Sequence, residues 1–520
     1  MRAAVVLVVA CASSFSFLLG YDIGIMSGAK RLIKIDLGLS EGDVELLVGI
    51  LNLVSGPGGL LSGRLADTMG RRAAAAIACA ITLVGALTMA AAQSFAVLLT
   101  GRVVTGIGVG CCFHIAPLYI AEVAPKHVRG RLMSFFDLSI NVGILAGYLV
   151  GWALTPRATR DTAGGAAGAA WRTMLALGAI PPALNLLALL RLPESPRYLV
   201  AAGREREAAD VLSLVYHPAE ASATLDLLRS ERRGNKPLNL CAGLRRVLLP
   251  ARGAPRALIV AGLGCAFWQQ ATGVEAAVYY TPETLEAAGI TDEGDLLLAT
   301  VGVGLVKVGF IVLAAALVES TGRVTLMLAS NAGLCAASLL LGLSFSLGRA
   351  VGLALAGQAL FMAAFSLGVG PCAMMAASEL FPLQVRGFAL GVATLINRTT
   401  SGLVAVSFLS LTRALTPAGA YYLFAALAAA AFAFTRRYVP ETKGRSLEEI
   451  EQHVAAQHRA SSGGLARLDA AAAADGDADV AVQPAVVVEM GAGSGGSGSG
   501  GGVYGRGALR RDAEAGHGQT

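Results

Sequence analysis

The sequence predicts an all-α protein that crosses a membrane about twelve times, with the crossings grouped in two related bundles of six helices. It is 55% hydrophobic and only 15% charged, with a mean hydropathy of +0.63. A soluble fold of this size could not cover so much apolar surface. The apolar residues come in runs of about 20, the length of a helix that spans a bilayer. Three charged motifs recur about 250 residues later, which predicts two parallel halves.

The long apolar runs place the membrane spans. We expect an N-terminal bundle over 1–191, with spans near 3–27, 44–65, 73–92, 96–119, 132–154 and 172–191. The polar stretch 192–256 is expected to form a loop with short helices. A C-terminal bundle over 257–439 follows, with spans near 257–281, 296–318, 324–346, 350–376, 387–411 and 419–437. The tail, 440–520, has too few apolar side chains to offset the entropy of ordering, so we expect it to be largely disordered.

The first apolar run has an alternative interpretation as a secretory signal peptide, because Arg2 precedes it. The run continues through Gly20, Tyr21 and Asp22, which is longer than a signal core, and the repeat requires this helix. We therefore expect a retained first span. No charged leader precedes it, which is consistent with a truncated start.

Charged residues between the spans predict the orientation. The loops after alternate spans are basic, as at Arg64, Arg71, Arg72, Lys126, Arg129, Arg131, Arg323 and Arg386. The opposite side is acidic, as at Glu283, Glu286, Asp292, Glu293 and Asp295. By the positive-inside rule, both termini and the central loop face the cytoplasm.

Composition also excludes several classes of function. The net charge of +6 comes from arginines between apolar runs, without the mixed basic and aromatic stripe of a nucleic-acid-binding surface. The eight cysteines show neither CxxC nor Cys/His spacing, so we expect no metal site. No nucleophile–base pair is visible, so we do not expect an enzyme. The expected surroundings are a lipid bilayer, with no obligatory protein partner.

The repeated motifs follow equivalent spans of the two halves. The motif Gly63–Arg72 after the second span recurs as Glu319–Arg323 after the eighth. The motif Glu122–Gly130 after the fourth span recurs as Glu379–Gly387 after the tenth. The motif Pro193–Arg197 after the sixth span recurs as Pro440–Arg445 after the twelfth. Parallel halves of this kind place a binding site at their interface, near the bilayer midplane.

These motifs resemble those of the sugar porter family of the major facilitator superfamily, over about residues 15–452. Within that family the sequence is most similar to plant polyol transporters. The similar stretches are Leu18–Ala29, Ile140–Leu145, Gly304–Lys307, Gly391–Val392 and Ile396–Arg398. The resemblance implies the major facilitator fold, a polyol or monosaccharide as the small-molecule substrate, and no cofactor except a proton as coupling ion.

Asp22 lies inside the first span, where a carboxylate costs about 2.5–3.5 kcal/mol unless it has a partner or a water-filled cavity. Arg102 in the fourth span is the expected partner. Proton coupling needs a carboxylate whose pKa changes between states, and a movable arginine could supply that change. The alternative is a structural ion pair; the resemblance to proton-driven porters favours coupling.

The seventh span carries Gln269, Gln270 and Tyr279, which suit a polyol because amide and hydroxyl groups both donate and accept hydrogen bonds without a charge to desolvate. Gly273 after the glutamines predicts an irregular helix that faces a cavity. In sugar porters the matching glutamines bind substrate, and the alternative is hydrogen bonding between helices. Further expected binding residues are Asn141, Glu275, Gly370 and Asn397.

The resemblance has three departures: Glu275 stands where many sugar porters have asparagine, Met374 replaces a tryptophan, and Val324 replaces the second arginine of a Gly-Arg-Arg motif. Lys307 in the eighth span is costly unless satisfied, so we expect it to pair with Glu275.

The charged loop motifs are implied by the resemblance to form a gate between helices. Its members are Asp67, Arg71, Glu122, Arg129, Glu319, Arg323, Glu379 and Arg386. Solvated surface charge, worth under about 1 kcal/mol per pair, is the alternative.

The sequence as a whole thus predicts proton-coupled symport of polyols or monosaccharides by alternating access. The alternatives are an uncoupled facilitator of the same fold and a sugar sensor that does not transport. The plasma membrane is the expected location, with the vacuolar membrane as the alternative.

Overall fold

The computed structural model describes residues 3–124, 126–159, 166–234, 240–250, 254–348, 350–382, 385–443 and 449. The expected disordered tail lies almost entirely outside these residues. In the described part every regular element is a helix, and eleven segments are long and apolar enough to cross a membrane. The predicted helical membrane fold is confirmed.

The first half contains seven helices that make six crossings. They are α1 (Ala3–Leu37), α2 (Glu41–Met69), α3 (Arg71–Ala90), α4 (Phe95–Val123), α5 (Lys126–Thr159), α6 (Ala166–Leu177) and α7 (Ile180–Leu189). The last two form one crossing, Ala167–Leu189, that is interrupted before Pro181 and Pro182. Proline lacks the backbone N–H that would continue a helix and is tolerated at its first turn, which explains the break.

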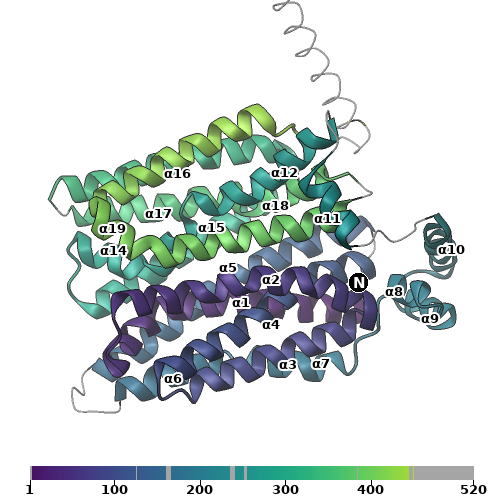
Figure 1. Ribbon diagram of the computed structural model, residues 1–520, viewed down its shortest axis with the longest axis horizontal. Coiled ribbons are helices and arrows are strands. Elements are labelled where there is room, and N and C mark those ends of the chain that lie inside the picture. Colours follow the sequence, from purple (N-terminus) through teal and green to yellow (C-terminus); the bar gives the residue numbers. More distant parts are fainter. Residues whose placement is uncertain are drawn as a thin grey trace, which may run out of the picture. The chain divides into compact units, whose positions relative to one another are not determined.

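Four short helices join the halves: α8 (Pro196–Ala201), α9 (Glu205–Val215), α10 (Pro218–Gly234) and α11 (Leu240–Leu248). The first three pack against one another and lie beside the end of the first half (Figure 1). Their core is small and apolar, with Leu199, Val200, Ala208 and Val211 buried.

The second half contains α12 (Ala254–Ala271), α13 (Val274–Tyr279), α14 (Thr281–Ala288), α15 (Glu293–Thr321), α16 (Arg323–Ser346), α17 (Val351–Leu367), α18 (Val369–Leu380) and α19 (Arg386–Tyr438). The 53 residues of α19 would reach about 80 Å as one helix, more than twice a bilayer core. The helix is broken at Thr416, where φ is 66°, just before Pro417. It therefore makes two crossings, and the described residues make twelve in all.

The halves meet along two helix pairs, α2 with α19 and α5 with α15, and α1 also touches α13 and α14. Figure 1 shows the purple and blue first half beside the teal and green second half. Small residues permit the close contact: an added Cβ at Gly49 would lie 2.8 Å from the Gly402 carbonyl oxygen, and one at Gly402 would lie 2.7 Å from the Leu53 nitrogen. Buried residues from both halves, including Tyr148 and Tyr279, form one continuous hydrophobic core.

Candidate functional site

A buried ion pair joins α1 to α4. The Arg102 Nη1 donates to both carboxylate oxygens of Asp22, at 2.8 and 2.6 Å. Arg102 is fully buried and Asp22 is 5% exposed. The remaining donors of the guanidinium reach α2, with Nε 3.0 Å from the Leu47 carbonyl and Nη2 3.4 Å from that of Val48. Arg102 thus satisfies the carboxylate and links three helices of the first half.

A small cavity of about 10 Å³ adjoins this pair, with Asp22, Thr82, Thr105 and Tyr21 in its lining. This volume is about the minimum that a single water molecule needs. The buried Thr105 hydroxyl makes no hydrogen bond with any described residue. The site therefore offers a polar position for one water beside the carboxylate.

The amides of the second half form a connected cluster. Gln269 Nε2 donates to the carbonyls of Val369 and Gly370, at 3.1 and 2.7 Å. Asn397 Nδ2 donates to Gln269 Oε1 at 2.7 Å, and Gln270 Nε2 lies 3.4 Å from Asn397 Oδ1. Three helices, α12, α18 and α19, meet here, so the structure brings together four of the expected binding residues.

Three expected binding residues lie outside this cluster: Asn141, Tyr279 and Glu275, the last on α13. Asn141 on α5 is half-buried and donates to the Asp137 carbonyl of its own helix at 2.9 Å; no hydrogen bond between described residues joins it to the amide cluster. Tyr279 is fully buried at the end of α13, and its hydroxyl accepts from Asn52 Nδ2 of the first half at 3.5 Å.

The break predicted at Gly273 is present. Gly273 has φ 92° and ψ 15°, a left-handed conformation that ends α12 and starts α13. Its Cβ would meet the Phe424 ring at 2.6 Å, so a side chain is excluded for a second reason. A second break at Gly368 separates α17 from α18; this break was not predicted from the sequence.

Three charged residues of the second half are buried: Glu275 on α13, Lys307 on α15 and Arg398 on α19. Glu275 is 6% exposed, Lys307 4% and Arg398 7%. The expected contact between Glu275 and Lys307 is not within ion-pair distance in the described structure; the Lys307 ammonium lies 4.8 Å from the Phe365 ring centroid.

Arg398 is a site residue that sequence reasoning missed. Its Nε and Nη2 donate to Asn397 Oδ1 at 3.1 and 2.8 Å, and its guanidinium lies 5.1 Å from the Phe113 ring centroid across the interface. Its place directly after Asn397, inside an apolar span, was the available signal.

The charged motif of the first half centres on Arg71. Its guanidinium contacts Glu122 at 2.8 Å and Asp67 at 3.1 Å. Glu194 accepts from the backbone N–H of Arg71 at 2.8 Å, at the start of α3. The Ser195 hydroxyl donates to Glu122 at 2.5 Å.

The second half repeats this arrangement. Arg323 contacts Glu379 at 3.3 Å, and Glu441 accepts from the backbone N–H groups of Arg323 and Val324, both at 3.0 Å. The Thr442 hydroxyl donates to Glu379. Because Val324 contributes its backbone, its apolar side chain does not disrupt the motif.

Glu194, Ser195, Glu441 and Thr442 were not expected as members of these clusters, although the Pro-Glu-Ser and Pro-Glu-Thr echo contained them. Arg386 donates to the Phe381 carbonyl at 3.2 Å. The side chains of Arg129 and Glu319 lie outside the described residues. The clusters hold helix ends together within each half; whether they act as a gate stays a prediction.

Comparison with known proteins identifies the family. The model of the family described as "Sugar (and other) transporter" matches residues 8–454. The chain is a sugar porter of the major facilitator superfamily. Its relatives are transporters, and it is accordingly an integral membrane transport protein rather than an enzyme.

This sugar porter is similar to several curated plant proteins. It is 40% identical over 457 residues to probable polyol transporter 4 of Arabidopsis thaliana, covering 85% of this chain and 84% of that protein. It is 37% identical over 465 residues to polyol transporter 5 of the same plant, with 85% and 84% covered.

Solved structures of the same fold include the proton:xylose symporter XylE bound to 6-bromo-6-deoxy-D-glucose. The TM-score is 0.74 at 26% identity, covering 87% of this sugar porter and 99% of that chain. The inward open conformation of the xylose transporter XylE from E. coli has a TM-score of 0.72 at 25% identity, with 86% and 100% covered.

Proposed function

We propose that this sugar porter is a proton-coupled symporter of sugar alcohols, with monosaccharides as further substrates. The observation that carries the coupling is the Asp22–Arg102 pair, a carboxylate buried in a membrane span beside a cavity the size of one water. Any movement of Arg102 away from Asp22 strands the charge and favours its protonation. Asp22 would take a proton from outside when the path opens outward and release it inside.

Polyols fit the chemistry of the amide cluster. Gln269, Gln270 and Asn397 form hydrogen bonds with one another and with backbone carbonyls, and the buried Gln270 Oε1 has no hydrogen-bond partner among the described residues. An acyclic chain of hydroxyls can replace each of these bonds, since every hydroxyl both donates and accepts. Similarity to proteins named as polyol transporters supports this choice of substrate.

We place the protein in the plasma membrane with both termini cytoplasmic; the vacuolar membrane is the alternative. The basic residues that follow α2 and α4, namely Arg71, Arg72 and Lys126, then face the cytoplasm, and Glu283 and Glu286 face outward. A membrane potential of 100 mV adds about 2.3 kcal/mol per proton moved inward, enough for substrate accumulation.

Two other functions have distinct signatures. In a facilitator Asp22 is only structural, so uptake carries no current. In a sensor, substrate binds without uptake. Structural similarity to a protein described as a proton:xylose symporter favours coupling over both.

Electrode recording in cells that express the chain tests the proposal, with sorbitol applied at pH 5.5 and at pH 7.5. We expect an inward current that grows with acidity and is absent in Asp22→Asn, because an amide cannot carry the proton. Sorbitol uptake without current would make the protein a facilitator. A panel of polyols and hexoses with neither uptake nor current would contradict transport.

A further inference from the structure

Helix α13 is short and depends on other elements for its position. It has six residues, starts after the left-handed Gly273 and ends at Tyr279. The last carbonyls of a helix have no partner within it and carry the negative end of its dipole. Because α13 carries both Glu275 and Tyr279, whatever holds these carbonyls also sets the geometry of the proposed substrate site.

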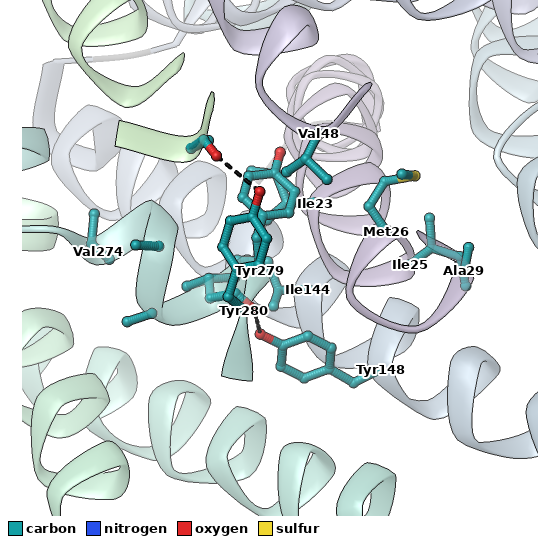
Figure 2. Close-up of a cluster of buried hydrophobic side chains, with 14 of the residues drawn as sticks. Ile23, Ile25, Met26, Ala29, Val48, Ile144, Tyr148, Val274, Tyr279 and Tyr280 are labelled. Carbon is teal, nitrogen blue, oxygen red and sulfur yellow. Dashed lines mark hydrogen bonds between the residues drawn. The ribbon is translucent and has the colours of Figure 1, made fainter. Parts of the chain in front are cut away.

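Two of the carbonyls are held by side chains of the opposite half. The Tyr148 hydroxyl of α5 donates to the Val278 carbonyl at 2.8 Å, and Figure 2 shows Tyr148 reaching this helix beside Tyr279 and Tyr280. The Lys30 ammonium of α1 donates to the Tyr279 carbonyl at 2.5 Å. The second half contributes Gln358, which donates to the Ala277 carbonyl at 2.8 Å.

Lys30 makes two further contacts with the second half. Its ammonium lies 2.8 Å from a Glu283 carboxylate oxygen and 4.0 Å from the Tyr280 ring centroid. The side chain is only 1% exposed. A buried ammonium is costly unless its donors are satisfied, and here a carbonyl, a carboxylate and a ring face satisfy it.

The next residue provides a natural comparison. Arg31 also pairs across the halves, with Glu286 at 3.2 Å and Glu293 at 3.8 Å, but its side chain is 43% exposed. Exposed pairs of this kind contribute little, since water competes for both charges. At the same junction, Lys30 therefore makes a buried contact between the halves and Arg31 makes an exposed one.

We propose that Lys30 and Tyr148 form a clamp through which the first half positions α13, and that this end of the transport path opens only when the clamp is released. Lys30 is a positioning residue: it acts on substrate through Tyr279 and Glu275. This inference rests on transport by alternating access. When the clamp is released, Gln358 still holds α13 to its own half, so α13 moves with the second half.

Removal of Lys30 should favour the open arrangement of this end. Lys30→Met leaves the Tyr279 carbonyl and Glu283 without their partner in the closed arrangement, whereas water satisfies both once the end is open. Tyr148→Phe removes one neutral hydrogen bond and should act in the same direction but less strongly. Lys30→Arg retains the charge and should restore part of the closure.

Thiol accessibility measures the opening directly. Ala277→Cys places a reporter at a buried position of α13, and a maleimide that does not cross membranes is added from each side in turn, with the parent chain as background for the native cysteines. We expect labelling from one side to rise about tenfold with Lys30→Met, about threefold with Tyr148→Phe, and less than twofold with Arg31→Met.

Equal labelling of the Lys30→Met and Arg31→Met proteins, with Tyr148→Phe like the parent, would overturn the clamp. If Lys30→Met fails to reach the membrane, Tyr148→Phe alone decides the outcome, and unchanged labelling in it would also overturn the clamp. Sorbitol uptake is measured in parallel; a clamp variant should change KM and maximal rate by different factors, and Lys30→Arg should partly reverse this. Changed labelling without any transport would refute the proposed function while leaving the clamp intact.

Discussion

At the scale of single residues, two buried charges of α1, Asp22 and Lys30, each have partners. Asp22 has Arg102 at 2.6 Å, and the sequence predicted this partner because a carboxylate inside an apolar span demands one. Lys30 was missed because it lies near the end of its span, beside Arg31, where a lysine ordinarily extends to the membrane surface. Only the fold shows that α13 covers it.

The buried carboxylate of Glu275 leads to a testable prediction about Lys307. Glu275 is buried, as are Lys307 and Arg398. Lys307→Met removes one compensating cation from a buried carboxylate and should lower sorbitol uptake by more than the double variant Glu275→Gln/Lys307→Met, in which no carboxylate is left. Uptake per molecule at the cell surface measures both. Equal losses in the single and double variants would show that the two charges act independently.

At the scale of elements, the sequence predicted the membrane spans better than it predicted the interruptions between helices. The interval between the spans ending near 411 and beginning near 419 contains the kink at Thr416, and Gly273 indicated the start of α13. The helix α14 lies in an interval between two spans that was expected to be acidic, with Glu283 and Glu286, and was not expected to form a helix. The break at Gly368 was missed although Gly370 and Pro371 follow it, because the apolar run continues on both sides.

Gly70 precedes α3 and leads to a testable prediction about the cap of that helix. Gly70 has φ 94°, and an added Cβ would lie 2.4 Å from the Glu194 carboxylate that caps the helix. Gly70→Ala should therefore lower the unfolding free energy by on the order of 1–3 kcal/mol, through both strain and displacement of the cap. Thermal unfolding of the protein in detergent measures the loss.

Gly203 is the matched control for this substitution. Its φ of 82° is also left-handed, but nothing lies within 4 Å of the added Cβ. Gly203→Ala should show the backbone strain alone and a smaller loss than Gly70→Ala. If the two variants have the same melting temperature, Glu194 does not stabilise the protein as a helix cap. Gly322→Ala, which faces Glu441 at 2.9 Å, should behave like Gly70→Ala.

At the scale of the whole molecule, the two halves are joined asymmetrically. Among the residues whose side chains are described, the ion pairs between halves all lie at the end where α1 meets α13 and α14 and where α2 meets α19; they involve Lys30, Arg31 and Arg413. The charged clusters around Arg71 and Arg323 each stay within one half. The internal repeat predicted the similarity of the halves, but side-chain contacts between them depend on the conformation, which a sequence does not specify.

Proton movement with substrate defines the proposed function. Its most direct measurement uses the purified protein in sealed vesicles that contain a pH-sensitive dye, with the membrane potential held at zero. A sorbitol gradient directed inward should acidify the interior, and vesicles with Asp22→Asn should show no acidification. Sorbitol entry at an unchanged internal pH would contradict proton coupling.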